Sequence, residues 1–505
     1  MTAPGARCDA RPAALALRPA LLDHRVRGRG AVLPAVEALG LLAREVRERD
    51  GRVDVRSSRE AEFLRFLELP AGQDALEVVV ESRPAGDGAV AAALLTRSPV
   101  GGSGVVRARE HARAVFGRCP DPPPCEVDQA VPEGPLFAVE PARLYAELVP
   151  FGPAFHNARE PILLGTDAAV ARLAAPAESA GTPALGSPYP LDAAFHVACA
   201  WGQRHLGRVL FPAGYAARRV LRPIPPGAVT SCLVTVTERA ADHARFDIRL
   251  WDEAGEPCEV TTGVRMGDPF RDDPPPVPGW IVAGEASGDP LAPLREVCAG
   301  LAVVELAALP PFAARALSER ERLRCSDLGP DRGRSFLAAR FALKRLARRL
   351  YPRVAAAPAE ALETVWADGV HPTVESAGLP DGLHHFAAAH DERFAVAVAG
   401  DQPIGIDVEP LSGRALRGER MFASEEERRR IRASGLDPAE AALLVWTAKE
   451  AVAKARDIPL VAAWRSAEVR TIGAARSELV VAGTVVVAHH ARLEGHIFTL
   501  LSLPE

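Results

Sequence analysis

The chain has 505 residues, of which 48% are hydrophobic and 25% charged, and its formal net charge is −5. This composition is that of a folded protein with room for roughly two to four domains. It argues against general nucleic-acid binding, and no apolar run approaches the ~20 residues that a membrane-spanning helix needs. We expect no signal peptide, because the N-terminal residues contain no unbroken apolar core. The chain has no C-x-x-C pair, so the eight cysteines predict free thiols in a cytoplasmic protein without a zinc site.

Two proline-rich stretches divide the chain. One runs from Cys119 to Cys125, and the other from Asp268 to Pro278. Proline clusters of this kind are typical of loops and linkers. They separate three segments, which cover about residues 1–118, 136–268 and 280–505.

The first segment predicts one long helix followed by strands. Apolar residues at helical spacing predict that the helix begins near Pro34. Strand-like runs follow at residues 76–81 and 89–96. His24 precedes the helix in a glycine-bearing loop, where its side chain is available for chemistry.

The second segment repeats this plan. A helix is expected from Pro190 to about His205, followed by strand-like runs at residues 230–236 and 244–251. Asp192 lies in the first turn of the helix, where an acid also stabilises the helix dipole. If the two segments pack as a pseudo-dimer, the first segment's histidine and this aspartate face one cleft.

This constellation resembles the double-hotdog dehydratase domains of polyketide and polyunsaturated-fatty-acid synthases. The matching pieces are His24-x-x-x-Gly28…Pro34, Phe151-Gly152-Pro153-x-Phe155 and Leu191-Asp192-x-x-x-His196. The resemblance covers about residues 14–270 and implies dehydration of a 3-hydroxyacyl group on a carrier-protein thioester. It implies that His24 removes the α-proton and that Asp192 protonates the leaving hydroxyl. These roles need a neutral histidine beside a protonated aspartate.

The segment departs from the family pattern in two places. Its glycine-to-proline spacing is one residue longer, and Phe151 stands where the family often has tyrosine. Two other functions stay open for this part: a non-catalytic docking module for a carrier protein, and an acyl-thioester hydrolase. His156 and His196 are expected to be structural or to line the pocket, and His111 has no assigned role.

The third segment contains a strongly basic stretch. Ser318-x-x-Glu321 is a capping box that predicts the start of a helix. Residues 332–353 then carry eight basic residues and no acidic one. We interpret them as a surface that contacts phosphate groups and an acidic protein partner, with Arg340 and Lys344 on one helical face. A solvated basic helix is the alternative.

Three carboxylates are expected to meet further along the chain. Residues 404–409 predict a short strand with Asp407 and Glu409 on one face. A helix capped by Asp437 follows and carries Glu450. If this helix packs on the strand, the three acids form a set of hard oxygen ligands. Such a set, without histidine or cysteine, suits Mg²⁺.

Lysine is rare in this chain. Only three of the 60 basic residues are lysines: Lys344, Lys449 and Lys454. Two of them lie in the helix that carries Glu450. Because a compact ammonium fits a tight phosphate contact better than a planar guanidinium, we interpret them as phosphate ligands. Chance placement is the alternative.

These residues carry a second resemblance. Gly405-Ile406-Asp407-Val408-Glu409, followed by Trp446-x-x-Lys449-Glu450-Ala451-x-x-Lys454, resembles the Sfp-type 4'-phosphopantetheinyl transferases. The resemblance covers residues 300–505 and implies two similar α+β halves, about residues 300–395 and 400–505, with Mg²⁺ and coenzyme A between them. It implies transfer of the phosphopantetheine arm of coenzyme A to a serine of a carrier protein, with release of 3',5'-ADP.

The resemblance also implies residue roles. Mg²⁺ is expected on Asp407, Glu409 and Glu450. The residues expected to bind coenzyme A or its phosphates are Arg340, Lys344, His371, His390, Lys449 and Lys454. Glu450 and Lys454 are the candidate catalytic groups, and either Glu450 or a metal-bound water takes the serine proton. The serines that flank the family's counterpart of His390 are absent here.

The sequence therefore predicts an α+β protein: a double hotdog over residues 1–272 with halves of about 14–118 and 136–270, a linker over 273–299, and a pseudo-two-fold transferase over 300–505. We expect a cytoplasmic bifunctional enzyme that acts as a separate subunit of an iterative synthase. Its expected partner is an acidic acyl carrier protein, not a nucleic acid or a membrane. A dimer through the hotdog domain stays open, as does a transferase part that is only a scaffold.

Overall fold

The computed structural model describes residues 9–26, 29–100, 105–177, 182–270, 273–284, 289–298, 300–366, 372–375 and 385–504. The chain forms two compact units. Unit 1 comprises Met1–Pro123 and Phe137–Ala283, and unit 2 comprises Pro124–Leu136 and Gly284–Glu505. Among the described residues, no helix combines the length and the apolar composition that crossing a membrane requires.

Unit 1 is built on a sheet of 12 strands in the order β1-β5-β6-β7-β4-β11-β14-β13-β12-β10-β9-β8. The strands of its first half are β1 (Asp9–Ala16), β4 (Ser57–Phe63), β5 (Ala75–Pro84), β6 (Val90–Val100) and β7 (Val105–Phe116). Those of its second half are β8 (Phe137–Val139), β9 (Ile162–Leu164), β10 (Ala168–Ala174), β11 (Phe211–Val220), β12 (Val229–Arg239), β13 (His243–Trp251) and β14 (Pro257–Gly267). A small pair, β2 (Arg25–Val26) and β3 (Gly30–Ala31), follows the first strand.

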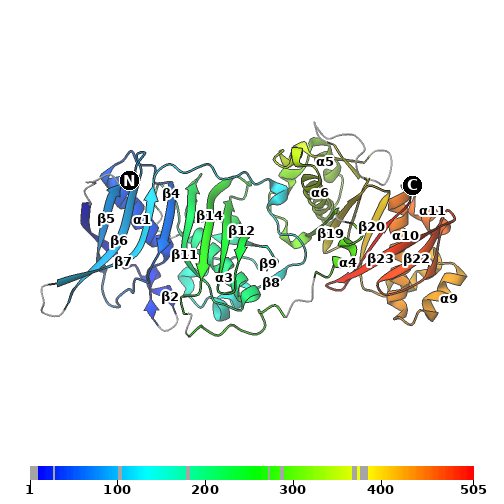
Figure 1. The fold of residues 1–505 in the computed structure, drawn as a ribbon, viewed down its shortest axis with the longest axis horizontal. Helices are drawn as coiled ribbons and strands as arrows, with labels where there is room; N and C mark the ends of the chain where they lie inside the picture. Colours follow the sequence, from blue (N-terminus) through cyan, green and yellow to red (C-terminus); the bar gives the residue numbers. More distant parts are fainter. Residues whose placement is uncertain are drawn as a thin grey trace. The chain divides into compact units, whose positions relative to one another are not determined.

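Each half of unit 1 wraps its strands around one long helix. Helix α1 (Ala35–Arg49) packs on β5, β6 and β7, and α3 (Tyr189–Leu206) packs on β10, β12 and β13. The halves join edge to edge through antiparallel pairing of β4 with β11, and the two helices contact each other (Figure 1). This arrangement confirms the predicted double hotdog and both of its predicted long helices.

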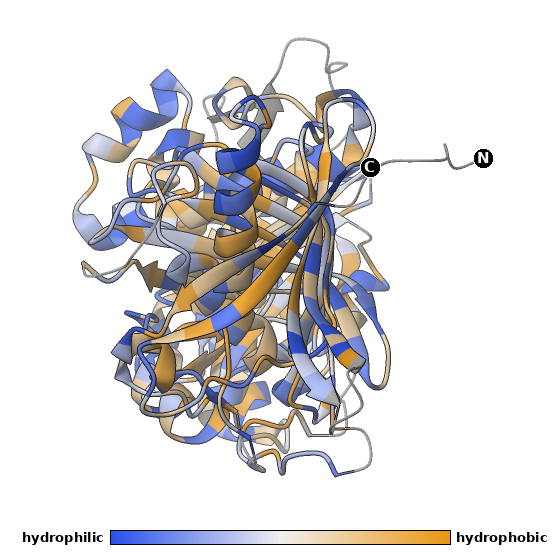
Figure 2. Ribbon diagram, turned by 90° about the vertical axis from the view of Figure 1, so that its left-hand side faces the viewer, coloured by the Kyte–Doolittle hydropathy of each residue, from blue (hydrophilic) through white to orange (hydrophobic). Residues whose placement is uncertain are grey.

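The hydropathy of the elements explains this layering. Helix α1 buries an apolar stripe that includes Leu39 and Leu42, whereas nearly all of α3 is buried between the sheet and neighbouring loops. Hydrophilic and hydrophobic residues alternate along several strands (Figure 2), as expected for a sheet with one covered face. The sequence pattern alone therefore sets which face of the sheet carries the helices.

Unit 2 contains two main sheets. One has three strands in the order β15-β19-β18, and the other has five in the order β20-β24-β23-β22-β21. The strands are β15 (Gly300–Glu305), β18 (His385–His390), β19 (Phe394–Gly400), β20 (Ile404–Pro410), β21 (Ala467–Thr471), β22 (Arg476–Val481), β23 (Thr484–Leu493) and β24 (His496–Ser502), with a separate pair β16 (Glu363–Trp366) and β17 (Pro372–Glu375). The helices are α4 (Ala292–Arg295), α5 (Glu319–Ser326), α6 (Pro330–Leu350), α7 (Arg414–Arg417), α8 (Glu419–Phe422), α9 (Glu425–Ala433), α10 (Pro438–Arg456) and α11 (Leu460–Ser466).

The two halves of unit 2 follow one plan. Helix α6 covers β15, β18 and β19, and α10 covers β20 and β24. The predicted caps are present, because Ser318 and Ser424 form capping boxes and Asp437 accepts hydrogen bonds from the first turn of α10. Unit 2 is thus the predicted pseudo-two-fold α+β domain.

A short segment of unit 2 comes from the middle of unit 1 in sequence. Residues 124–136, which the predicted domain boundaries assign to the hotdog domain, pack on α6 and β15 of unit 2. Asp128 is fully buried, and its two carboxylate oxygens accept hydrogen bonds from Arg348, each at 2.8 Å. Arg345 donates to three carbonyls of the same segment.

The basic stretch differs from the expected docking surface. Four basic side chains of α6 are buried: Arg340, Lys344, Arg345 and Arg348. Two of them hold residues 124–136 in place, so their charges are used inside the unit. The interpretation of this helix face as a surface for an acidic partner does not fit its burial. A run of basic letters does not show which of them face solvent.

Candidate active sites

His24 lies at the end of a short 3-10 turn, Pro19–Asp23, in unit 1. Its Nδ1 is 3.0 Å from the carbonyl oxygen of Val32, so Nδ1 carries the proton and Nε2 is left as an acceptor. The rings of Phe151 and Phe155 pack on the imidazole, at 4.2 and 5.0 Å between centroids. Burial lowers the pKa of His24, which outweighs the raising effect of Asp192. The residue is thus kept neutral, as a base must be.

Asp192 is buried in the first turn of α3, and its Oδ2 lies 3.1 Å from Nε2 of His196. The two residues are one turn apart, so the helix itself fixes their contact. The ring of Phe151 packs on His196 at 5.1 Å as well as on His24. His196 therefore adjoins the candidate acid, which agrees with its predicted pocket-lining place.

The Phe-Gly-Pro turn is clamped to the residue before His24. Asp23 accepts a hydrogen bond from the Ala154 amide through Oδ2, and its carbonyl accepts one from the Gly152 amide. A Cβ at Gly152 would lie 2.4 Å from the Asp23 carboxyl carbon. Glycine is therefore needed here because the two segments approach closely. Asp23 was not among the predicted site residues, although it directly precedes the candidate base.

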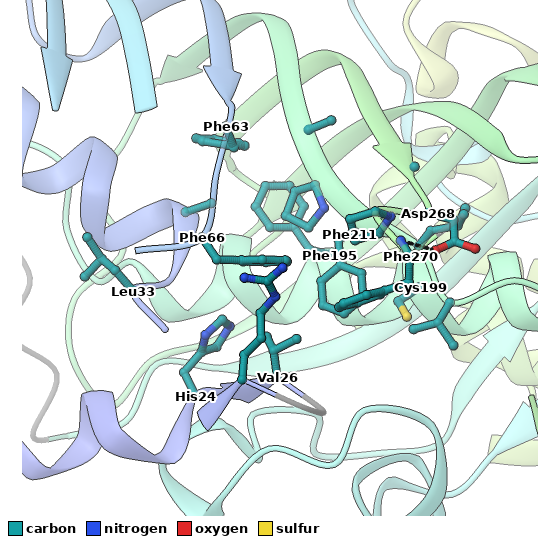
Figure 3. Close-up of a pocket in the computed structure, with 18 of the residues that line it drawn as sticks. His24, Val26, Leu33, Phe63, Phe66, Phe195, Cys199, Phe211, Asp268 and Phe270 are labelled. Atoms are coloured by element: carbon teal, nitrogen blue, oxygen red, sulfur yellow. Dashed lines mark hydrogen bonds between the residues drawn. The ribbon is translucent and has the colours of Figure 1, made fainter. Parts of the chain in front are cut away.

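His24 and Asp192 line one cavity of about 1080 Å³. Apolar rings make up much of its wall, and Figure 3 shows His24 together with Phe63, Phe66, Phe211 and Phe270 around this space. A cavity of this kind suits a long, mainly apolar ligand. Gly28, which belongs to the dehydratase-like motif, lies outside the described residues.

The second candidate site forms where β20 meets α10 in unit 2. Gly405 allows the close approach, because a Cβ there would lie 1.9 Å from the carbonyl oxygen of Ala451. Asp407, Glu409 and Glu450 then converge, with one ligand atom from each lying within 4.8 Å of the others. This confirms the predicted meeting of the strand and the helix at three carboxylates.

The charges in this cluster favour a cation. Burial and the neighbouring Asp407 raise the pKa of Glu409 to about 7 and that of Glu450 to about 8. Asp407 Oδ1 accepts from Lys454 Nζ at 2.7 Å, whereas its buried Oδ2 has no hydrogen-bond partner among the described residues. Three crowded carboxylate oxygens, one of them without a partner, fit a hard divalent cation such as Mg²⁺.

Three of the predicted coenzyme-binding residues gather near the cluster. Burial lowers the pKa of His390, and the positive charges of Lys454 and Arg340 lower it further. Arg340 is buried with its guanidinium 4.2 Å from the ring of Phe336, and burial lowers its pKa to about 10. The two cations and the neutral imidazole lie within one electrostatic neighbourhood, which is suited to phosphate groups.

Lys344 and Lys449 lie elsewhere. Lys449 Nζ is 2.8 Å from Glu427 and also donates to two main-chain carbonyls, whereas Lys344 Nζ is 2.6 Å from Glu321 and does the same. Both are buried. The structure gives them internal partners, so the interpretation of these two lysines as phosphate ligands does not fit. His371 lies outside the described residues.

Two family models match the chain. Residues 124–268 match the polyketide synthase dehydratase N-terminal domain, and residues 403–499 match the 4'-phosphopantetheinyl transferase superfamily. No curated protein sequence matches significantly.

Several solved structures are similar to unit 1. The dehydratase domain of a mycocerosic acid synthase-like polyketide synthase is 21% identical, with a TM-score of 0.42, over 52% of this chain and 90% of that one. The bifunctional dehydratase-cyclase domain of ambruticin biosynthesis is 22% identical, with a TM-score of 0.40, over 52% and 90%. The dehydratase domain of the CurJ module of curacin polyketide synthase is 16% identical, with a TM-score of 0.43, over 53% and 93%.

The sheet topology of unit 1, the carboxylate cluster of unit 2 and the two family models agree with one another. The chain joins a double-hotdog domain of the polyketide synthase dehydratase type to a domain of the 4'-phosphopantetheinyl transferase superfamily.

Proposed function

We propose that unit 2 transfers 4'-phosphopantetheine from coenzyme A to a serine of an acyl carrier protein and releases 3',5'-ADP. The observation that carries this proposal is the carboxylate cluster, with the unpartnered Oδ2 of Asp407. Asp407, Glu409 and Glu450 would hold Mg²⁺. The ion, when bound, neutralises charge on the diphosphate of the coenzyme.

The protein groups around the cluster have separate tasks. Lys454, held at 2.7 Å from Asp407, places a positive charge beside the phosphates. Arg340 and His390 bind the remaining phosphate groups of coenzyme A. Glu450 adjoins the phosphate site and is the candidate that takes the proton of the attacking serine; a metal-bound water is the alternative.

Intact mass spectrometry of an apo acyl carrier protein tests the transfer. The full chain with coenzyme A and Mg²⁺ should add the phosphopantetheine arm, and chelation should stop the reaction. Asp407→Ala should lower the rate at least ~10³-fold, because one ligand and the partner of Lys454 are lost. Asp401→Asn, an exposed carboxylate before β20, should change nothing. Transfer that survives Asp407→Ala would overturn the proposal.

We also propose that unit 1 dehydrates 3-hydroxyacyl groups on a carrier protein in polyketide or polyunsaturated fatty acid biosynthesis. His24 Nε2 takes the α-proton, the C–O bond at the β-carbon breaks, and Asp192 gives its proton to the departing hydroxyl, which leaves as water. The product is a 2-enoyl thioester. Support comes from the placement of both residues on one cavity and from the lowered pKa of His24.

Product analysis separates this activity from its alternatives. A 3-hydroxyacyl carrier protein should lose water with the wild type and not with His24→Gln, whereas His489→Gln, in the other unit, should behave like the wild type. Release of free acid would indicate a hydrolase. Binding without any product would indicate a docking module.

A further inference from the structure

A second polar group lines the cavity of unit 1 and has no part in the proposed dehydration. His111 of β7 shares this cavity with His24 and Asp192, and it is only 8% exposed. Its Nε2 lies 2.8 Å from the hydroxyl oxygen of Thr96, which lines the same cavity. Its Nδ1 has no hydrogen-bond partner among the described residues. A buried ring nitrogen without a hydrogen-bond partner costs free energy, so a ligand that hydrogen-bonds to this nitrogen gains binding free energy.

The backbone at His111 departs from regular strand geometry, and this departure orients the side chain. The ladder between β6 and β7 slips one residue at His111, since Leu94 pairs with Ala112 and Leu95 with Glu110. The carbonyl of this bulged residue accepts a hydrogen bond from the Leu64 amide at 2.8 Å. A β-bulge redirects one side chain out of the regular alternation. Here the bulge fixes the main chain of His111, and Thr96 fixes its ring.

The surroundings favour a ligand oxygen. Burial lowers the pKa of His111 and outweighs the raising effect of the backbone at Arg65 and Phe66. The charges of Arg65 and Arg109 add to the lowering, so the ring is neutral and carries one donor and one acceptor nitrogen. The two arginines also line the cavity and make this wall electropositive. A ketone or hydroxyl oxygen matches such a wall, whereas a methylene group leaves Nδ1 unsatisfied.

We propose that His111 and Thr96 bind an oxygen atom that the acyl chain carries beyond its reacting carbons. This specificity rests on the proposed dehydratase function of unit 1. The preferred substrates are then 3-hydroxyacyl chains with a further keto or hydroxyl group. Fully reduced chains are the poorer substrates, while the phenylalanine rings of the cavity hold the hydrocarbon part of either class (Figure 3).

Matched unreactive ligands test this directly. The probes are amide-linked acyl-pantetheine analogues, in pairs that differ only by a ketone or a methylene at one distal odd-numbered carbon. Calorimetric titration of the full chain should show at least ~10-fold tighter binding of the ketone in at least one pair. His111→Phe should reduce this preference to less than ~2-fold without weakening the methylene analogue. Thr96→Val should reduce it as well, and it changes the volume very little.

The control is His243→Phe, which alters another histidine of the cavity wall and should keep the preference. Equal affinity of the wild type within every pair would overturn the proposal, as would a preference that survives His111→Phe or an absence of binding to any analogue. The dehydration assay is read separately. Preserved ketone selectivity without water loss would refute the dehydratase function and leave the oxygen-binding site standing.

Discussion

The two halves of unit 2 share an internal framework and differ in what they hold. In the first half, Lys344 of α6 pairs with Glu321, the third residue after the capping serine of α5. In the second half, Lys449 of α10 pairs with Glu427, the third residue after the capping serine of α9. Each lysine also donates to a carbonyl that lies two residues before the capping serine.

The glutamates complete the correspondence. Glu321 Oε1 accepts from the Thr364 amide at 3.0 Å, and Glu427 Oε1 accepts from the Val469 amide at 2.8 Å. One buried ion pair per half therefore ties a helix cap, a long helix and a strand together. The lysines that appeared to mark a phosphate site are repeated structural elements.

The difference begins one residue after each lysine. Glu450 follows Lys449 and belongs to the carboxylate cluster, whereas Arg345 follows Lys344 and binds residues 124–136. The strands differ in the same way. Leu306 and Leu411 make equivalent amide bonds directly after β15 and β20. Counted back from these leucines, the places of Asp407 and Glu409 are taken by Ala302 and Val304. The second half thus carries the three carboxylates, and the first half binds residues 124–136.

The largest effect should come from removing the buried acid that the first half holds. Asp128→Ala leaves Arg348 buried without its bidentate partner, which should destabilise unit 2 by about 4–5 kcal/mol. A chain limited to residues 284–505 should also be unstable, because it lacks Asp128. Hydrogen exchange of the α6 amides in the full chain measures this stability without interference from unit 1.

Glu133→Ala is the matched control. Its carboxylate pairs with Arg349, whose side chain is 46% exposed, so the loss should stay below ~1 kcal/mol. A loss below ~1 kcal/mol for Asp128→Ala as well would show that residues 124–136 are not a structural part of unit 2.

Replacing either of the two buried lysines should destabilise unit 2 by a similar amount, which is slightly smaller than the effect of Asp128→Ala. Lys344→Met and Lys449→Met each leave a buried glutamate without its cationic partner, at a cost of about 3–4 kcal/mol. The double variant Glu427→Gln/Lys449→Met removes the uncompensated charge and should regain most of the stability. Carrier-protein labelling by the refolded double variant should return to within ~10-fold of wild type.

That last measurement separates two roles of Lys449. A stable double variant that transfers nothing would restore the interpretation of this lysine as a phosphate ligand. Lys454→Met provides the contrast, because it should fold and lose transfer.

The sequence revealed the carboxylate cluster but not the role of every neighbour. Asp407 and Glu409 alternate with apolar residues, and Glu450 lies on a helix with clear capping signals, so both the elements and the meeting of their faces could be predicted. Lys449 directly precedes Glu450 and points to another side of α10. Single-sequence periodicity does not tell a buried, paired lysine from one that faces a ligand.

Other features depend on contacts between distant residues. Asp128 lies just after the proline-rich stretch Cys119–Cys125, and only the folded chain shows that Arg345 and Arg348 bind this segment. The bulge at His111 arises from pairing of β6 with β7, which the alternation of apolar residues does not encode. His24 and Asp192 were found because helix starts and turns have local signals.

A smaller effect is expected from closing the space between β20 and α10. Gly405→Ala places a methyl group against the Ala451 carbonyl and should push the strand from the helix, at about 1–3 kcal/mol. Because this moves Asp407 away from Glu450, Mg²⁺ affinity should fall with it. Calorimetric titration of the metal measures the effect.

The equivalent glycine of the first half gives the comparison. At Gly300 a Cβ would lie 2.8 Å from the Ala399 carbonyl oxygen, within the three-stranded sheet that carries none of the three carboxylates. Gly300→Ala should therefore lower stability and leave metal affinity unchanged. Loss of metal affinity in both variants would mean that the halves are coupled more tightly than their frameworks suggest.

The smallest expected effect concerns acid stability. His490 of β23 is buried between Ser477 and Thr499, with both ring nitrogens 2.9 Å from a hydroxyl, and burial lowers its pKa to about 3. The equivalent strand position in the first half, opposite Ala397, is Ala388. Only the second half therefore has a titratable group at this place.

The sign of the pH effect follows from proton uptake. Between pH 6.5, the ordinary pKa of histidine, and about 3, the unfolded chain binds a proton at His490 that the folded chain does not. Stability of the second half should therefore fall as the pH falls through this window. His490→Gln should be less stable at pH 7 and yet lose less between pH 7 and 4, whereas exposed His385→Gln should follow the wild type. Parallel pH profiles for all three, read from hydrogen exchange of α10, would show that the acid sensitivity of the second half arises elsewhere.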